Sequence, residues 1–366
     1  MTTRVRAALL EAAGKRVVMA KLDLIEPRAG EVRVRMLASG VCHSDLHVRD
    51  GEWERPTPIV MGHEGAGVVE AVGPGVTSPR VGQVVALSWL IPCGVCRACV
   101  LGHVWACSNS PSFRHRLLDG ETAFRGALSY CAIGTMAEAS VVPAAAAIPI
   151  PDGLDPAAAA LIGCCVATGV GAVTKTAAVP PGSTVAVIGL GGVGLSCVMG
   201  AVLASASRIV AIDRVPAKVE LARTFGASDG LVAGDDPAAT IQALQDRTDG
   251  GPDFIFEAIG RTSTIELAIA SLPLGGTAVL VGLTPFGERA AFDVYPFVDG
   301  SRRILGSNYG FADPAIDFPR YAALALEGRL PIERLVDRRL GLDELEDAFA
   351  AMRRGEHIRQ VIVFDR

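Results

Sequence analysis

A glycine-rich segment between two strand-like runs constrains the fold of this 366-residue chain more than any other feature. Residues 184–188 (TVAVI) are typical of a buried strand, and Gly189–Gly194 (GLGGVG) opens an apolar, helix-like stretch over 193–206. The next strand-like run ends on Asp213, 19 residues after Gly194. In this context the glycines let a pyrophosphate approach the helix N-terminus, and the acid can bind the adenosine ribose. The sequence therefore predicts a dinucleotide-binding fold.

The rest of the chain divides around this segment. A helix over 216–225 and strands over 254–257 and 277–281 continue the alternation of strand and helix, which predicts a doubly wound parallel sheet. The first 90 residues predict a mostly β domain. They hold period-two alternation or short β-branched runs at 32–35, 65–72 and 81–87. After residue 309 we expect two helices and a last strand, at 318–327, 342–353 and 360–364. The predicted class is α/β.

Charge and hydropathy exclude several classes of protein. The net charge of −5 argues against nucleic acid or an anionic membrane as the main partner, because both favour a basic excess. Residues 176–207 form an uncharged run of 32, long enough to span a bilayer, but the glycines and prolines inside it favour strand–turn–helix instead. No apolar secretory segment follows the first residues, so we expect a cytoplasmic protein.

The strongest local metal signal is a C-x2-C-x2-C-x7-C motif in a glycine-containing loop. Four thiolates gathered by one loop favour a closed, tetrahedral zinc site, which here would be formed by Cys93, Cys96, Cys99 and Cys107. An iron–sulfur cluster is the alternative, but its motif places the fourth cysteine after three residues, followed by proline. Unliganded cysteines are the other alternative.

A second set of metal-binding residue types is dispersed. It comprises Cys42–His47 (CHSDLH), Gly62–Glu64 (GHE) and Gly163–Cys165 (GCC). A cysteine, a histidine and a second cysteine from these segments would form a Cys2His zinc site with an open fourth position. By residue type alone, each is more often an ordinary buried residue. His103, His115 and His357 match no motif, and we interpret them as ordinary polar positions.

These signals together, in this order, resemble the zinc-containing medium-chain alcohol dehydrogenase family over essentially the whole chain. Further matching segments are 162–169, 256–260, 281–282 and 358–359. Within the family, the chain looks most like the class III-like actinobacterial members, some of which oxidise thiol adducts of formaldehyde. Residues 87–89, 309–310 and 328–330 carry this closer likeness.

The resemblance implies two domains with the active site in the cleft between them. Residues 1–165, completed by 309–366, would form a GroES-like catalytic domain that includes the zinc lobe 93–107, and 166–308 would form the Rossmann domain. Two zinc ions per chain are expected. Cys42, His63 and Cys164 would hold the catalytic ion. Cys165 stands where the family usually has glycine, so which thiol of that pair is the ligand stays open.

The resemblance also implies the roles of residues around the catalytic ion. Asp45 and Glu64 would orient the ligands and moderate the charge of the zinc. Ser44 would accept the alcohol proton and pass it through the nicotinamide ribose to His47. Trp89 would wall the substrate pocket and Trp53 would lie nearer its mouth; two core tryptophans are the alternative.

The implied cofactor is NAD, because the Asp213 carboxylate would repel the 2′-phosphate of NADP, although Arg214 directly behind it leaves NADP as the alternative. Lys218 would help Asp213 hold the ribose. His43, which replaces the arginine of many relatives, and Arg359 would contact the pyrophosphate, and Thr168 the nicotinamide. The remaining expected cofactor contacts are Gly189, Gly191, Gly192, Val193, Gly194, Ile259, Val281 and Tyr309.

We therefore expect a homodimeric or homotetrameric enzyme that transfers hydride between a primary alcohol or aldehyde and NAD(H). Three alternatives stay open: a mycothiol-type formaldehyde dehydrogenase, an aldehyde reductase of specialised metabolism, and a non-catalytic NAD-binding sensor. The last is disfavoured because a pure binder needs no proton relay.

Overall fold

The computed structural model describes residues 2–364, which divide into two compact units. The first contains the chain up to Cys164 and from Asp313 onward, and the second is Cys165–Ala312. These limits lie one and four residues from the boundaries expected from the sequence. Each unit is described by itself below.

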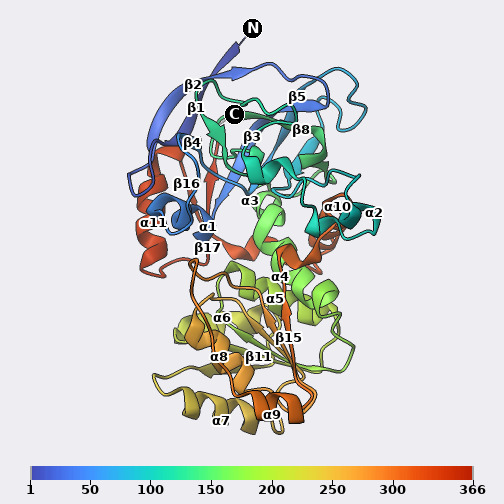
Figure 1. Cartoon of the computed structure of the whole chain (residues 1–366), viewed down its shortest axis with the longest axis vertical. Helices are drawn as coiled ribbons and strands as arrows, with labels where there is room; N and C mark the ends of the chain where they lie inside the picture. Colours follow the sequence, from blue (N-terminus) through green and yellow to red (C-terminus); the bar gives the residue numbers. More distant parts are fainter. Residues whose placement is uncertain (1, 365–366) are drawn as a thin grey trace. The chain divides into compact units, whose positions relative to one another are not determined.

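The first unit is built on two β-sheets (Figure 1). The smaller has the strand order β2-β1-β4-β7, and the larger the order β16-β17-β3-β5-β6-β9, with β8 paired to β3. Antiparallel pairing of β3 with β5, β8 and β17 makes β3 the centre of the larger sheet. The strands are β1 Thr2–Leu10, β2 Val18–Ile25, β3 Glu31–Val41, β4 Ile59–Val60, β5 Gly65–Val72, β6 Val84–Leu87, β7 Leu128–Ser129, β8 Ala139–Pro143, β9 Ala147–Pro149, β16 Val336–Leu340 and β17 Arg359–Val363.

Short helices join and cover these strands. Asp155 and Asp313 each cap a helix that begins with proline, a residue suited to the first turn because its missing N–H has no partner there. The α-helices are α1 His43–Asp50, α2 Arg97–Val100, α3 Pro156–Leu161, α10 Pro314–Leu326 and α11 Leu345–Arg353. The 3-10 turns are η1 Val104–Ala106, η2 Pro111–Arg114, η3 Tyr130–Ala132, η4 Ala144–Ala146, η8 Ile332–Leu335 and η9 Leu342–Glu344.

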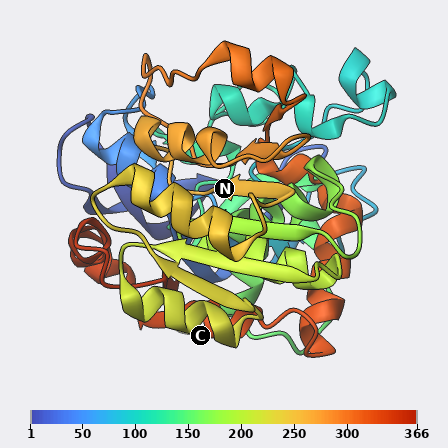
Figure 2. The same ribbon diagram turned by 90° about the horizontal axis from the view of Figure 1, so that it is seen from below.

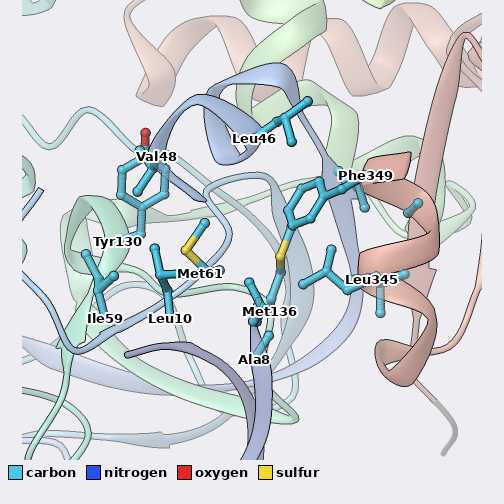
Figure 3. Close-up of a cluster of buried hydrophobic side chains, with 14 of the residues drawn as sticks. Ala8, Leu10, Leu46, Val48, Ile59, Met61, Tyr130, Met136, Leu345 and Phe349 are labelled. Carbon is cyan, nitrogen blue, oxygen red and sulfur yellow. The ribbon is translucent and has the colours of Figure 1, made fainter. Parts of the chain in front are cut away.

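An apolar core fills the space between the smaller sheet, α1 and α11 (Figure 3). Leu46 of α1 and Phe349 of α11 pack there with Met61, Tyr130 and Met136. Burial of side chains of this size stabilises the fold by about 1.5–3 kcal/mol each. This core fixes the start of α1, the helix that follows Cys42.

The second unit is a doubly wound α/β domain (Figure 2). Its six strands are all parallel, in the order β12-β11-β10-β13-β14-β15. The strand order reverses direction at β10, so right-handed crossovers place helices on both faces of the sheet. The strands are β10 Thr184–Ile188, β11 Arg208–Asp213, β12 Asp229–Val232, β13 Phe254–Glu257, β14 Thr277–Leu280 and β15 Arg303–Gly306. The helices are α4 Ala167–Gly171, α5 Gly192–Leu203, α6 Pro216–Thr224, α7 Pro237–Arg247, α8 Thr262–Ala270 and α9 Val294–Asp299, with π-helical η6 Ala172–Thr176 and the 3-10 turn η7 Tyr309–Phe311. The α/β class, with a mostly β domain and a Rossmann domain, is confirmed.

The uncharged run 176–207 divides into a loop, β10 and α5, as the glycines and prolines predicted. A different helical stretch, Pro156–Thr176, is long and apolar enough to cross a membrane, but 89% of its apolar window is buried inside the structure. It comprises α3, the π-helical segment η5 Ile162–Val166, α4 and η6. Such burial is typical of a core helix.

Candidate metal and cofactor sites

Four potential metal ligands converge in the first unit: Cys42, His63, Glu64 and Cys164, whose ligand atoms all lie within 4.8 Å of one another. Cys42 ends the turn between β3 and α1, His63 and Glu64 lie between β4 and β5, and Cys164 lies in the π-helical segment η5. A π-turn changes the direction of the side chains that follow it, and such turns often occur at functional sites. Cys165 is not a member of this group, so the structure brings together Cys42, His63 and Cys164 as the resemblance implied.

The carboxylate of Asp45 orients this group. Its Oδ2 accepts a hydrogen bond from the backbone N–H of Cys42 at 3.1 Å, and its Oδ1 lies 3.1 Å from Nδ1 of His63. A proton on Nδ1 leaves Nε2 with a free lone pair, the form in which histidine binds a metal. Within residues 2–364, Nε2 of the buried His63 has no hydrogen-bond partner. The group thus presents a buried lone pair beside two thiols.

Glu64 is fully buried and pairs with the guanidinium of Arg359, which is itself only 5% exposed. Burial raises the pKa of Glu64 to about 7, and the charge of Arg359 opposes this shift. A Cβ atom at Gly40 would come within 2.0 Å of Oε2 of Glu64, so glycine at that position makes room for the carboxylate. Arg359 was expected to contact the cofactor pyrophosphate; the structure shows its ion pair with Glu64.

A second group of potential ligands forms the lobe between β6 and β7. The four sulfur atoms of Cys93, Cys96, Cys99 and Cys107 lie within 4.8 Å of one another. The backbone N–H groups of Cys93 and Cys96 donate to Sγ of Cys107 and Sγ of Cys93, each at 3.3 Å. Backbone N–H donors lower the pKa of Cys93, and they lower that of Cys96 to about 6, whereas burial raises the pKa of Cys99 to about 12. A closed set of four thiols fits a structural zinc ion.

The residues expected to relay the proton lie on α1. Ser44 Oγ accepts a weak hydrogen bond from the Cys42 thiol at 3.7 Å. One turn further on, Nδ1 of His47 lies 2.5 Å from Glu52, and the ring stacks on Trp53 with the ring centroids 4.7 Å apart. His43 is the first residue of α1. The structure therefore holds the His47 ring between a carboxylate and an indole.

The two tryptophans differ in their surroundings. Trp53 is 8% exposed and belongs to the same apolar core as Leu46 and Phe349, which matches the alternative of a core tryptophan. Trp89 is partly buried and packs against a second core that includes Leu87, Ile91 and Ile133.

In the second unit the glycine loop takes the form that its motif predicts. Gly189 has φ +90°, a conformation suited to glycine, and a Cβ at Gly194 would come within 1.7 Å of the Gly189 carbonyl oxygen. A Cβ at Gly191 would meet no atom within 4 Å. Gly189 and Gly194 are thus required by packing, whereas Gly191, which precedes α5, leaves open space next to the helix N-terminus.

Asp213 ends β11 and faces this loop. Its Oδ2 accepts from the Leu190 N–H at 2.8 Å and its Oδ1 from the Val215 N–H at 3.0 Å. These two bonds hold the carboxylate in one orientation beside the loop. Arg214 pairs with Asp235.

The other expected cofactor residues lie on several elements. Gly192 and Val193 form the first turn of α5, Lys218 is on α6 and Thr168 on α4. Ile259 is exposed and lies over Gly189. Val281 directly follows β14, and Tyr309 is buried in η7.

Tyr130 and His115 were not identified as site residues from the sequence. The Tyr130 ring meets His63 edge-on, with the centroids 5.4 Å apart, and lies 5.7 Å from the ring of His115. His115, which was interpreted from the sequence as an ordinary polar position, is 5% exposed. No local sequence motif marks either residue.

The comparisons with known proteins agree with this geometry. The family model described as alcohol dehydrogenase GroES-like domain matches residues 28–152, and the one described as zinc-binding dehydrogenase matches residues 192–327. The chain belongs to the zinc-containing medium-chain alcohol dehydrogenase family.

Individual relatives match the chain over nearly its whole length. S-(hydroxymethyl)glutathione dehydrogenase of Escherichia coli O1:K1 / APEC is 37% identical, over 98% of this chain and 99% of the relative. Alcohol dehydrogenase class-3 of Myxine glutinosa is 35% identical, over 98% of this chain and 97% of the relative. Among solved structures, benzyl alcohol dehydrogenase from Acinetobacter calcoaceticus is 30% identical with a TM-score of 0.94, covering 99% of this chain and 100% of that one.

Proposed function

We propose that this protein is a zinc-dependent oxidoreductase that transfers hydride between a primary alcohol or aldehyde and NAD(H). The observation that carries the proposal is the group formed by Cys42, His63 and Cys164, in which Asp45 leaves Nε2 of His63 free for a metal. Two thiols and one imidazole form a donor set that suits catalytic zinc, with one position left for substrate. The carboxylate of Glu64 in the same group would moderate the positive charge.

When bound, zinc supplies a Lewis acid that lowers the pKa of an alcohol hydroxyl. The chain itself must then remove the proton. Ser44 is adjacent to the ligand thiol of Cys42 and would accept it, and His47 would carry it onward to solvent. Glu52 would orient the His47 ring, because its carboxylate lies 2.5 Å from Nδ1.

For the cofactor we propose NAD rather than NADP. The carboxylate of Asp213 is held beside the glycine loop by two backbone donors, where it would accept from the ribose hydroxyls and repel a 2′-phosphate. The open space next to Gly191 leaves room for the pyrophosphate. Contacts of His43, Thr168, Lys218, Ile259, Val281, Tyr309 and Arg359 with the cofactor belong to the same proposal.

A second zinc ion in the lobe of Cys93, Cys96, Cys99 and Cys107 is also proposed. The cytoplasm is the proposed location, and the proposed assembly is a homodimer or a homotetramer.

We propose Trp89 as a wall of the substrate pocket. An aromatic surface near the metal group would suit aromatic or long-chain primary alcohols.

One alternative substrate class has specific support. Relatives with the printed name S-(hydroxymethyl)glutathione dehydrogenase match 98% of the chain, so a thiol adduct of formaldehyde is the second candidate. That name supports glutathione as the thiol, whereas mycothiol is suggested only by the sequence resemblance.

The test is an assay of NADH formation with a panel of primary alcohols, run with and without formaldehyde plus a low-molecular-weight thiol. Turnover that zinc chelation abolishes supports the proposal. Turnover only with the thiol adduct selects the alternative. Tight NAD binding with no turnover of any alcohol, adduct or aldehyde would favour a non-catalytic sensor and overturn the proposal.

A further inference from the structure

A buried carboxylate lies where the strand order of the second unit reverses. Glu257 is the last residue of β13 and is paired with Ile188, the last residue of β10. From β10 the chain continues to β11 on one side, and it returns to the other side of β10 at β13. In doubly wound sheets, ligands bind at such a switch point, beyond the carboxyl ends of the strands. Glu257 thus ends the strand that lies next to the glycine loop.

Burial of this carboxylate opposes folding. Glu257 is fully buried, and within residues 2–364 no ion pair involves it. Burial raises the pKa of Glu257, and hydrogen bonds from Thr264, Gly260 and Ile259 oppose that rise. A buried charge destabilises a fold unless hydrogen bonds replace its water. Because an apolar side chain would fill the core at a lower cost, we interpret Glu257 by the groups that it binds.

The carboxylate of Glu257 holds the loop that follows β13. Its Oε1 accepts from the backbone N–H groups of Ile259 and Gly260, at 3.0 and 2.9 Å. The same oxygen accepts from the Thr264 hydroxyl at 2.8 Å, and Oε2 accepts from the Gly260 N–H at 3.2 Å. Thr264 belongs to the first turn of α8. One side chain therefore connects the end of β13, the loop and the start of α8.

The backbone of Glu257 also holds the loop after β14. Its carbonyl oxygen accepts from the N–H groups of Val281 and Gly282, both at 2.9 Å. The two loops are in close contact, because a Cβ atom at Gly282 would lie 2.1 Å from the Gly260 nitrogen, and one at Gly260 would lie 2.4 Å from the Leu283 carbonyl oxygen. Movement of one loop would therefore displace the other.

Ile259 connects this arrangement to the glycine loop. Its side chain is 42% exposed, and its Cγ1 would lie 2.4 Å from a Cβ atom at Gly189. A partly exposed apolar side chain thus lies directly over the first glycine of the loop. The backbone N–H of the same residue donates to Glu257, so the carboxylate controls where this apolar surface lies.

We infer that Glu257 is a positioning residue for the cofactor: its carboxylate holds segment 258–260 in the conformation in which Ile259 contacts a dinucleotide bound at the glycine loop. A segment already held in its bound conformation loses less conformational entropy when the ligand binds. If the segment adopted that conformation only part of the time, the apparent Kd would rise by the inverse of that fraction. This inference rests on the proposed function, because it adds a residue to the proposed cofactor site.

The test is calorimetric titration of the full chain with NADH. We would compare wild type with Glu257→Ala, Glu257→Asp and Glu257→Gln, and use Glu220→Ala, at an exposed position of α6, as matched control. Glu257→Ala should raise the Kd about tenfold or more, and the shorter side chain of Glu257→Asp should raise it about fivefold. Glu257→Gln should stay within about twofold of wild type, because one amide oxygen can accept the bonds now made to Oε1. Glu220→Ala should leave the Kd unchanged.

A second position separates positioning of the cofactor from a purely structural role. Ile259→Ala removes the apolar contact, so in that background Glu257→Asp should have little further effect on the NADH Kd. If Glu257 acted only on stability, Glu257→Asp would lower the Tm and leave the Kd of the folded protein unchanged in both backgrounds. Should Glu257→Ala not fold, the comparison of Glu257→Asp in the two backgrounds decides the question.

Failure of the inference can be separated from failure of the proposed function. Equal Kd values in wild type and Glu257→Asp, or an equal effect of Glu257→Asp with and without Ile259→Ala, would overturn the inference while the dehydrogenase stands. NADH binding without turnover of any alcohol, adduct or aldehyde overturns the proposed function, and the order of the Kd values still tests the inference. A folded wild type that does not bind NADH overturns both.

Discussion

Asp45 links the two halves of the metal group: one carboxylate oxygen accepts the backbone N–H of Cys42, and the other faces Nδ1 of His63. The carboxylate is fully buried, so both contacts are shielded from solvent. Because Asp45 is in the first turn of α1, the start of this helix and the tautomer of the proposed ligand depend on one side chain.

Replacement of Asp45 should therefore weaken metal binding before it unfolds the chain. For Asp45→Ala we expect a loss of zinc affinity of about 10–100-fold, because His63 loses the acceptor that orients it. Asp45→Asn keeps an acceptor and should lose less. Competition with a chelator, followed by metal analysis, measures the zinc affinity of each variant and of wild type. Retention of wild-type affinity in Asp45→Ala would show that the carboxylate does not orient the ligand.

The two cysteine-containing groups should respond differently to loss of a ligand. A structural zinc site contributes about 10–16 kcal/mol of apparent binding free energy, comparable to the stability of a whole domain. Cys107→Ser should thus unfold or aggregate, whereas His63→Ala should fold, bind one zinc and lack activity. Circular dichroism measures whether each of the two variants folds, and metal analysis measures how much zinc each one binds. A wild type with one zinc, or with iron, contradicts the assignment.

The sequence predicted best those features that are local. The glycine loop, Asp213 and the four-cysteine motif each lie within one short stretch, where spacing alone limits the geometry. The strand over 65–72 was predicted with the same limits as β5, but β6 begins at Val84 rather than at residue 81. The strands β12 (DGLV) and β15 (RILG) were missed because each combines only two apolar residues with a charged residue and a glycine, whereas the equally short β13 (FIFE) has three apolar residues in a row.

The candidate site was less accessible to sequence reasoning, since its members come from separate segments. Only the family resemblance connected Cys42, His63 and Cys164. The contact of Tyr130 with His63 and the burial of His115 arise from tertiary packing, which leaves no periodic or spacing signal in the sequence. The same holds for Trp53, whose indole lies in a core and against His47.

Two glycines of the cofactor loop form a matched pair of tests. A methyl group at Gly191 meets open space, whereas one at Gly194 collides with the Gly189 carbonyl oxygen. Gly191→Ala should keep the wild-type melting temperature and raise KM for NAD, because the methyl occupies the space proposed for the pyrophosphate. Gly194→Ala should lower the melting temperature by several degrees. Unchanged NAD affinity in Gly191→Ala would place the pyrophosphate elsewhere.

Asp213 should determine the choice between NAD and NADP. A 2′-phosphate against its carboxylate is a like-charge contact that costs several kcal/mol, and about 1.4 kcal/mol corresponds to tenfold. Wild type should favour NAD by roughly a hundredfold or more. Asp213→Asn should narrow the ratio of NAD to NADP use, while its one amide oxygen keeps an acceptor for either the Leu190 or the Val215 N–H. The ratio of kcat/KM for the two cofactors is the measurement, and equal values in wild type contradict this role.

His115 should make the stability of the fold sensitive to mild acid. Its pKa is lowered from 6.5 to about 4 by burial, so the unfolded chain binds a proton more readily than the folded chain. Stability from this residue is fully present above pH 6.5 and is lost as the pH falls toward 4. Between pH 6.5 and 4, the free energy of unfolding should fall by about 1.4 kcal/mol per pH unit because of this residue.

Metal ligands also protonate in acid, so the informative quantity is the difference between wild type and His115→Asn in urea unfolding at pH 7.5 and pH 5. His115→Asn removes the titrating ring and should lose less stability between the two pH values than wild type. An identical loss in both proteins would show that the His115 ring is readily protonated in the folded state, and hence that burial does not keep it neutral.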